Sequence, residues 1–186
     1  MKPIKLFTIL LPLVLLFVAF QPSAKGSEWD KKITITIDAP VEVPGVDEIK
    51  VVDPGTYVFK VMDNSADRNI VQIWSADESQ LITTILAVQD YRPQPADSPI
   101  VKFGENVSGA PQAIREVFYP GDAYGWEFVY PRGRALKIAK ANNRNVLSKT
   151  ETSAEPHTLV NAEVNAVTPE GSKAQNSTAA NPKPQH

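Results

Sequence analysis

The sequence predicts an all-β fold: an antiparallel β-sandwich of about eight strands, similar in size to an immunoglobulin-like or transthyretin-like domain. Three observations lead to this prediction. Between Lys32 and Pro131 the apolar residues fall into runs of four to eight that are rich in β-branched and aromatic side chains. Polar turn residues and Pro-Gly pairs separate these runs at the regular spacing of small sandwiches. No stretch before Pro131 shows a helical apolar period of useful length.

The strands can be assigned in order along the chain. Ile33, Ile35 and Ile37 alternate with threonines, which is the pattern of a strand with one buried face. The remaining runs predict strands at 49–52, 56–62, 69–74, 81–88, 100–103, 113–119 and 126–130. Three Pro-Gly pairs, at 44–45, 54–55 and 120–121, favour type II turns because glycine tolerates the positive φ that such a turn requires.

The N-terminal residues are typical of a secretory signal peptide, expected to span 1–26. Two lysines precede a 15-residue apolar run, Leu6 to Phe20, and the small residues Ala24 and Gly26 offer a cleavage site. This run is shorter than the ~20 residues with which a helix crosses the hydrocarbon core, so cleavage is expected rather than a retained membrane anchor. The protein is therefore expected to be secreted or periplasmic in a bacterium.

Charge is distributed unevenly along the chain. Loss of three lysines with the signal peptide changes the net charge from −2 to −5. Residues 27–131 hold 17 acidic and 8 basic residues, a net charge of −9, so nucleic acid is not expected as a partner. Four bases, Arg132, Arg134, Lys137 and Lys140, then follow without an acid between them.

This basic segment, 132–141, predicts a short helix or extension that closes the domain. Leu136, Ile138 and Ala139 are available for packing, and the bases complement the acidic body. The alternative is a contact with anionic lipid or polymer at the cell envelope, worth about 1 kcal/mol per basic residue near a charged surface. The sequence leaves both interpretations open.

The remaining residues, 142–186, are expected to form a disordered tail. They contain no aromatic residue, and their sparse apolar side chains cannot offset an ordering entropy of roughly 1–2 kcal/mol per residue. The predicted organisation is a signal peptide at 1–26, a β-sandwich domain at 27–141 and a tail at 142–186.

Aromatic residues near the end of the domain are the first candidate for a ligand site. Trp126 and Tyr130 share one face of the predicted strand 126–130, and Tyr124 precedes it in the same aromatic segment; such rings belong either to the core or to a platform for sugar rings. Tyr91 and Arg92 open a proline-rich loop that is a second candidate for recognition.

The sequence does not decide the register between the predicted strands 113–119 and 126–130. Pairing of Tyr119 with Trp126 places Val117 and Arg115 on the aromatic face, whereas a slip of one residue places Glu116 there instead. A charged residue lies beside the rings in either register. This face is therefore expected to be partly exposed or to hold a partner for the charge.

Paired carboxylates are the second kind of candidate site. Glu116 and Glu127 lie on neighbouring predicted strands, and a glycoside hydrolase needs two carboxyl groups roughly 5–9.5 Å apart beside a cleft. Arg115 is the more natural partner for either acid, and a domain of about 100 residues leaves little room for a cleft. No catalytic residue is therefore assigned.

No metal or cofactor is expected. The chain has no cysteine, and both of its histidines fall in the predicted tail. Oxygen-bearing side chains at Asp63, Ser65 and Asp67 resemble the start of a calcium loop, but Trp74 occupies the position of the bidentate glutamate. A polar hairpin loop is expected there instead.

Three motifs carry a resemblance to known proteins: VDPGTY at 52–57, FYPGD at 118–122 and EFVYP at 127–131. Together they resemble recurring signatures of a group of small secreted bacterial β-domain proteins of unassigned function. The resemblance spans about residues 33–141. It implies a signal peptide, a compact β domain and a variable tail, and it offers no catalytic residue to transfer.

These observations predict a secreted or periplasmic, non-enzymatic module with a binding or structural role in the cell envelope. Its partner is expected to be an envelope polymer or another envelope protein. One alternative is a carbohydrate-binding module that uses the aromatic platform. The other is a small carboxylate-dependent glycoside hydrolase that uses Glu116 and Glu127.

Overall fold

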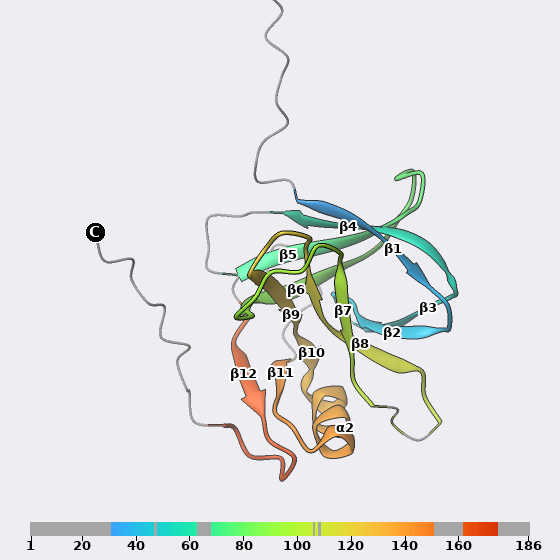
Figure 1. Cartoon of the computed structure of the whole chain (residues 1–186). Helices are drawn as coiled ribbons and strands as arrows, with labels where there is room; N and C mark the ends of the chain where they lie inside the picture. Colours follow the sequence, from blue (N-terminus) through green and yellow to red (C-terminus); the bar gives the residue numbers. More distant parts are fainter. Residues whose placement is uncertain are drawn as a thin grey trace, which may run out of the picture.

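A computed structural model describes residues 31–46, 48–62, 68–105, 107, 109–150 and 162–174 (Figure 1). The expected signal peptide and the loop 63–67 lie outside these residues. The elements within them are β1 (Lys32–Ile37), β2 (Val41–Pro44), β3 (Ile49–Val52), β4 (Gly55–Met62), β5 (Arg68–Ser75), β6 (Leu81–Tyr91), β7 (Ile100–Phe103), β8 (Gln112–Phe118), β9 (Tyr124–Phe128), β10 (Tyr130–Pro131), α2 (Arg132–Asn142), β11 (Val146–Lys149) and β12 (Val164–Val167).

The all-β class predicted from the sequence is confirmed, and each of the eight predicted strands overlaps an observed strand. The large sheet has nine strands in the order β1-β4-β5-β6-β9-β8-β2-β3, with β7 beside β8. The strands thus form one continuous hydrogen-bonded sheet, where the sequence predicts the two sheets of a sandwich. The prediction of a purely antiparallel arrangement is wrong, because β2 runs parallel to β8.

The sheet curves so that its two ends contribute to the same core (Figure 1). Ile33, Ile35 and Ile37 of β1, at one end of the strand order, share a buried cluster with Val52 of β3, at the other end. Only 53–54 separate β3, at one end of the strand order, from β4, which lies next to the strand at the other end. The alternating side chains of β1 place every second residue in this core.

Of the three Pro-Gly pairs, the one at 120–121 has the predicted turn geometry. Gly121 has a φ of 77°, and the Asp122 N–H donates to the Tyr119 carbonyl at 3.2 Å. Gly45 and Gly55 do not have positive φ, so the prediction of type II turns there is wrong. The turn at 120–121 joins β8 to β9 and sets their register.

The basic segment forms α2, in agreement with the predicted short helix. Ala135, Ile138 and Ala139 are buried in the main core, so the helix closes one end of the sheet. Asn143 ends the helix in the left-handed conformation, with a φ of 48°. Within the described residues no helix is long and apolar enough to cross a membrane.

The prediction of disorder from residue 142 onward is wrong for 142–150 and 162–174. Here β11 pairs with β10 and β12 in a three-stranded sheet, and Val146 and Val167 are buried. The tail has few apolar residues of its own, but β11 and β12 bury some of them against the body, and this contact with distant residues supplies the missing stabilisation. Residues 151–161 and 175–186 lie outside the described part of the chain.

Candidate functional site

The register of β8 and β9 decides which aromatic rings face the core. Val117 lies opposite Trp126, and Glu116 lies opposite Glu127. Val117 and Tyr119 therefore share the face of Trp126, as expected from the first register, but the pairing of Tyr119 with Trp126 in that register is wrong, because Val117 pairs with Trp126. The Tyr119 and Trp126 rings meet edge to face at 5.0 Å. This is the concave face of the sheet, and its rings belong to the core.

The predicted aromatic platform does not form, because two of its three rings are buried. Trp126 is 5% exposed and Tyr130 is 0% exposed. The Tyr130 hydroxyl donates to the Ile114 carbonyl at 2.7 Å, so its polar end is satisfied within the core. Burial also raises the pKa of Tyr130 well above its ordinary value. Both residues stabilise the fold and cannot stack on a ligand.

Tyr124, the third predicted ring, remains at the surface together with Tyr91. The two residues lie directly opposite each other on β9 and β6. Tyr91 is 59% and Tyr124 is 50% exposed, and their ring centroids are 5.5 Å apart with the planes inclined by 56°. These rings form an exposed aromatic pair where the two strands meet at their ends, and we call it the tyrosine pair.

Arg92 follows the tyrosine pair but turns back onto the protein. Its guanidinium lies over the Phe118 ring at 5.6 Å from the ring centroid, and its backbone N–H donates to the Ala123 carbonyl at 2.8 Å. Phe118 lies flat against β9 because Gly125 has no side chain there; a Cβ would come within 2.4 Å of the ring. Arg92 therefore anchors this end of the sheet, and its predicted role in recognition has no direct support in these contacts.

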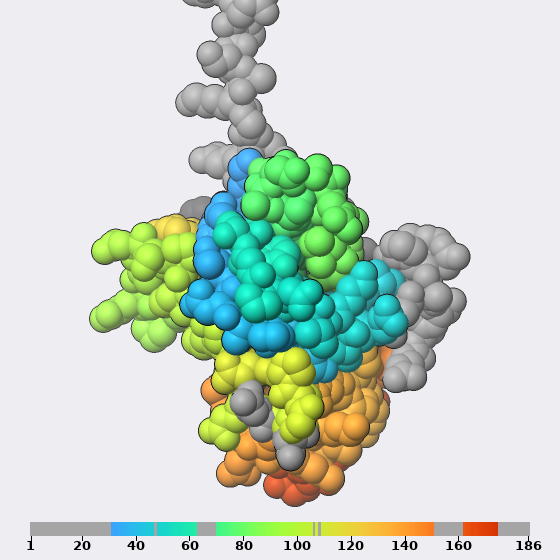
Figure 2. Space-filling model, turned by 90° about the vertical axis from the view of Figure 1, so that its right-hand side faces the viewer, coloured from blue at the N-terminus to red at the C-terminus, as the bar shows by residue number. Residues whose placement is uncertain are grey.

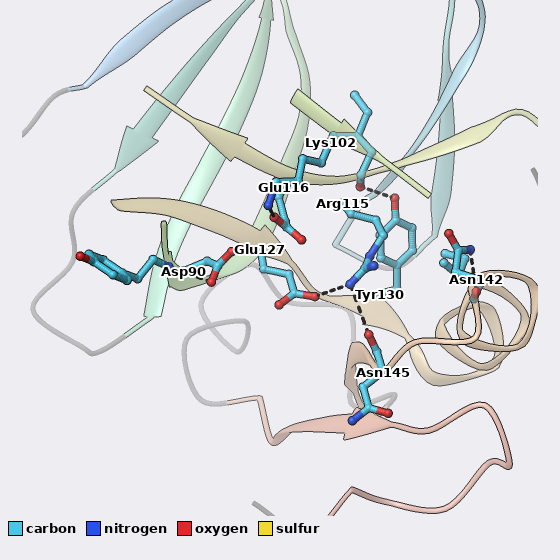
Figure 3. A network of polar contacts seen from close by, with 11 residues as sticks. Asp90, Lys102, Arg115, Glu116, Glu127, Tyr130, Asn142 and Asn145 are labelled. Carbon is cyan, nitrogen blue, oxygen red and sulfur yellow. Dashed lines mark hydrogen bonds and ion pairs between the residues drawn. The ribbon is translucent and has the colours of Figure 1, made fainter. Parts of the chain in front are cut away.

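The opposite face of the same strands carries a cluster of charged side chains (Figure 3). Lys102 of β7 donates to Glu116 at 2.5 Å, and Arg115 donates to Glu127 at 2.8 Å. The register of β7 and β8 shifts between Lys102 and Phe103, at the level of Arg115. Arg115 thereby joins the face of the two glutamates, so its expected place on the aromatic face is wrong, and it also donates to the Asn145 carbonyl at 3.2 Å.

Two carboxyl groups of this cluster have raised pKa values. Burial raises the pKa of Glu127, and the nearby Arg115 guanidinium opposes this effect. Burial also raises the pKa of Asp90, while the hydrogen bond that its carboxylate accepts from the Tyr91 N–H at 2.7 Å opposes it. Both groups thus hold a proton more tightly than exposed carboxyl groups do.

The two predicted carboxylates, Glu116 and Glu127, therefore lie on paired strands, but their surroundings suit a structural role better than a role in hydrolysis. Each glutamate already holds a base, as the sequence suggested for Arg115, and the Glu116 side chain is only 5% exposed. A hydrolase needs a carboxyl group that can reach both water and the glycosidic oxygen. Among the described residues, no three His, Cys, Asp or Glu side chains are grouped so that they could hold a metal ion.

The basic segment contributes one ion pair to the acidic body and leaves three bases at the surface. Arg134 forms an ion pair with the buried Glu42, so it joins the helix to the acidic body. Arg132, Lys137 and Lys140 remain exposed. Glu42 could not be identified as a partner from the sequence, because the two residues lie 92 positions apart and no local pattern relates them.

Comparison of the chain with models of known protein families, with curated proteins and with solved structures finds no match.

Proposed function

We propose that the protein is a secreted or periplasmic, non-enzymatic binding module of the bacterial envelope, and that the tyrosine pair is its contact surface. The supporting observation is that Tyr91 and Tyr124 are exposed, touch each other and are fixed by direct pairing of β6 and β9. Two exposed rings on paired strands offer contact area at little entropic cost, since the backbone is already ordered.

The surroundings of the pair support recognition of a polymer or protein. Asp122, in the turn before Tyr124, forms an ion pair with Lys31 at 2.5 Å, which fixes the turn. The segment 93–99 beside Tyr91 contains three prolines and is largely exposed. The resemblance to small secreted β-domain proteins agrees with this proposal and names no ligand.

A sugar chain is the second candidate ligand, because pyranose rings stack on exposed aromatic side chains. The 56° inclination of the two rings excludes one flat platform across both. A glycan would therefore have to bend and contact each ring separately. A glycan ligand is therefore a more restrictive hypothesis than an envelope partner of any kind. Variants of Tyr91 and Tyr124 test both hypotheses.

The experiment is a binding screen of the full-length chain, produced by secretion, against envelope glycans, peptidoglycan and envelope extracts. Tyr91→Ala/Tyr124→Ala is expected to abolish the interaction, whereas Tyr91→Phe/Tyr124→Phe keeps the rings and is expected to retain most of it. Phe103→Ala is the matched control, since Phe103 is 42% exposed on a different strand. Unchanged binding by the double alanine variant would reject the tyrosine pair as the contact surface. Glycan cleavage that Glu116→Gln abolishes would reject the non-enzymatic role.

A further inference from the structure

The solvent side of α2 carries a row of basic residues that the tyrosine pair does not involve. Lys137 and Lys140 are exposed three residues apart on one side of α2, and the exposed Arg144 follows in the turn after Asn143 ends the helix. We call these three residues the basic row.

The basic row is not neutralised within the described part of the chain. No ion pair there includes Lys137, Lys140 or Arg144, whereas Arg134 is paired with Glu42. Residues 132–150 contain six bases and no acid. Glu105 and Glu170 border the helix, since the Glu105 N–H donates to Asn142 and Arg132 donates to the carbonyl of Gly171, but neither glutamate forms an ion pair with the row.

The row is held in a fixed arrangement. Ala135, Ile138 and Ala139 anchor the other side of α2 in the main core, and the Asn142 amide donates to the Ile138 carbonyl at 2.8 Å near the helix end. The backbone positions of the three bases are therefore set before any partner arrives. Ligand binding would have to order only their side chains.

The position of the row bears on the kind of partner. Helix α2 lies at one pole of the molecule, and β1 begins at the other (Figures 1 and 2). No large apolar side chain is exposed on the helix, so it has nothing to insert into a bilayer. The lack of an exposed apolar side chain favours a flexible chain of charges over a lipid surface as the partner.

We propose that the basic row binds a linear polyanion of the cell envelope, in which phosphate or carboxylate groups repeat along the chain. Three bases on and just after one helix can each meet an anionic group of such a chain, and the acidic body disfavours binding elsewhere on the surface. The interaction is electrostatic, so added salt weakens it.

The test measures binding of the full-length chain to sodium polyphosphate and to polygalacturonate, which distinguish a phosphate from a carboxylate polymer. Lys137→Gln/Lys140→Gln/Arg144→Gln is expected to weaken binding of at least one polymer by about tenfold or more at low salt. Lys31→Gln/Lys32→Gln/Lys173→Gln removes the same charge elsewhere and is expected to bind like the natural chain. Melting curves confirm that both variants fold.

Three results would overturn the proposal. The first is that neither polymer binds. The second is that both triple variants lose affinity equally, since net charge alone then explains binding. The third is that the chain binds phosphatidylglycerol vesicles through the basic row but binds neither polymer. Tyr91→Ala/Tyr124→Ala is expected to keep polyanion binding, so failure of this proposal and failure of the tyrosine pair can be told apart.

Discussion

The body of the sheet and the C-terminal unit, which comprises α2, β11 and β12, are stabilised in different ways. The body encloses large apolar side chains, such as Phe59, Ile73 and Ile85, each 0% exposed. The C-terminal unit adds four side chains to that core, Ala135, Ile138, Ala139 and Val146, of which only Ile138 is large. A smaller apolar cluster around Leu86, Val129 and Ala162 lies between β12 and the body.

Polar groups supply much of the remaining attachment of the C-terminal unit. Arg134 pairs with Glu42, Arg115 donates to the Asn145 carbonyl, and the buried Lys149 ammonium donates to the Gly45 carbonyl at 3.2 Å. Such contacts fix geometry but add less net free energy than apolar burial, because the charges lose their hydration. We infer that the body unfolds as one unit and that the C-terminal unit opens more easily.

The largest expected effect is in the body. Phe59→Ala should lower the free energy of unfolding by about 3–5 kcal/mol, because it leaves a cavity in the middle of the concave face. Urea denaturation measures the change. Val51→Ala is the control, since Val51 is 55% exposed on β3 and should cost less than about 0.5 kcal/mol. Similar losses for the two variants would contradict the assignment of the core.

A smaller effect is expected where the C-terminal unit meets the body. Glu42→Gln leaves the Arg134 guanidinium partly buried without its counter-ion and should cost about 2 kcal/mol. The double variant Glu42→Gln/Arg134→Gln removes both charges and should cost less than the single one. A double variant that is less stable than Glu42→Gln would show that the ion pair is not the main contact.

The smallest effect concerns the pH dependence of the charged cluster. Burial raises the pKa of Asp90, so the folded chain binds this proton more tightly than the unfolded chain does. The ionised group therefore lowers stability at neutral pH, and this cost disappears below the unfolded pKa of about 4.

Asp90→Asn should accordingly stabilise the protein at about pH 7 and change its stability little at about pH 3.5. Its side-chain oxygen can still accept the hydrogen bond from the Tyr91 N–H. The comparison is Asp97→Asn, which removes the same charge at an exposed position. Melting temperatures at the two pH values provide the measurement, and a stabilisation that is larger at the lower pH would reverse the argument.

The sequence predicted the parts of the fold that depend on local patterns. Alternation in β1 and the β-branched runs are local signals, so all eight predicted strands correspond to observed ones. The strand β2 was missed because its run, VEVP, is only four residues long and ends in a proline, which is rare inside a sheet. The strands β11 and β12 were missed because their stability comes from contacts with distant residues.

The candidate site shows the same limit. Tyr124 and Trp126 alternate on one strand and looked alike in the sequence, yet one is 50% and the other 5% exposed. Their difference arises because Trp126 lies over Tyr119 and Val117, whereas Tyr124 lies opposite Tyr91 at the end of β6. Whether a ring is buried or exposed depends on how far the core extends along the strand. The periodicity of the sequence does not reveal that extent.

Residue-resolved hydrogen exchange of the full-length chain without denaturant tests the difference between the two regions most directly. Amides of β5 and β6 should exchange only with the full free energy of unfolding, whereas those of β11 and β12 should exchange at a clearly lower opening free energy. Equal opening free energies in the two regions would contradict the account, because the C-terminal unit would then belong to the same cooperative structure as the body.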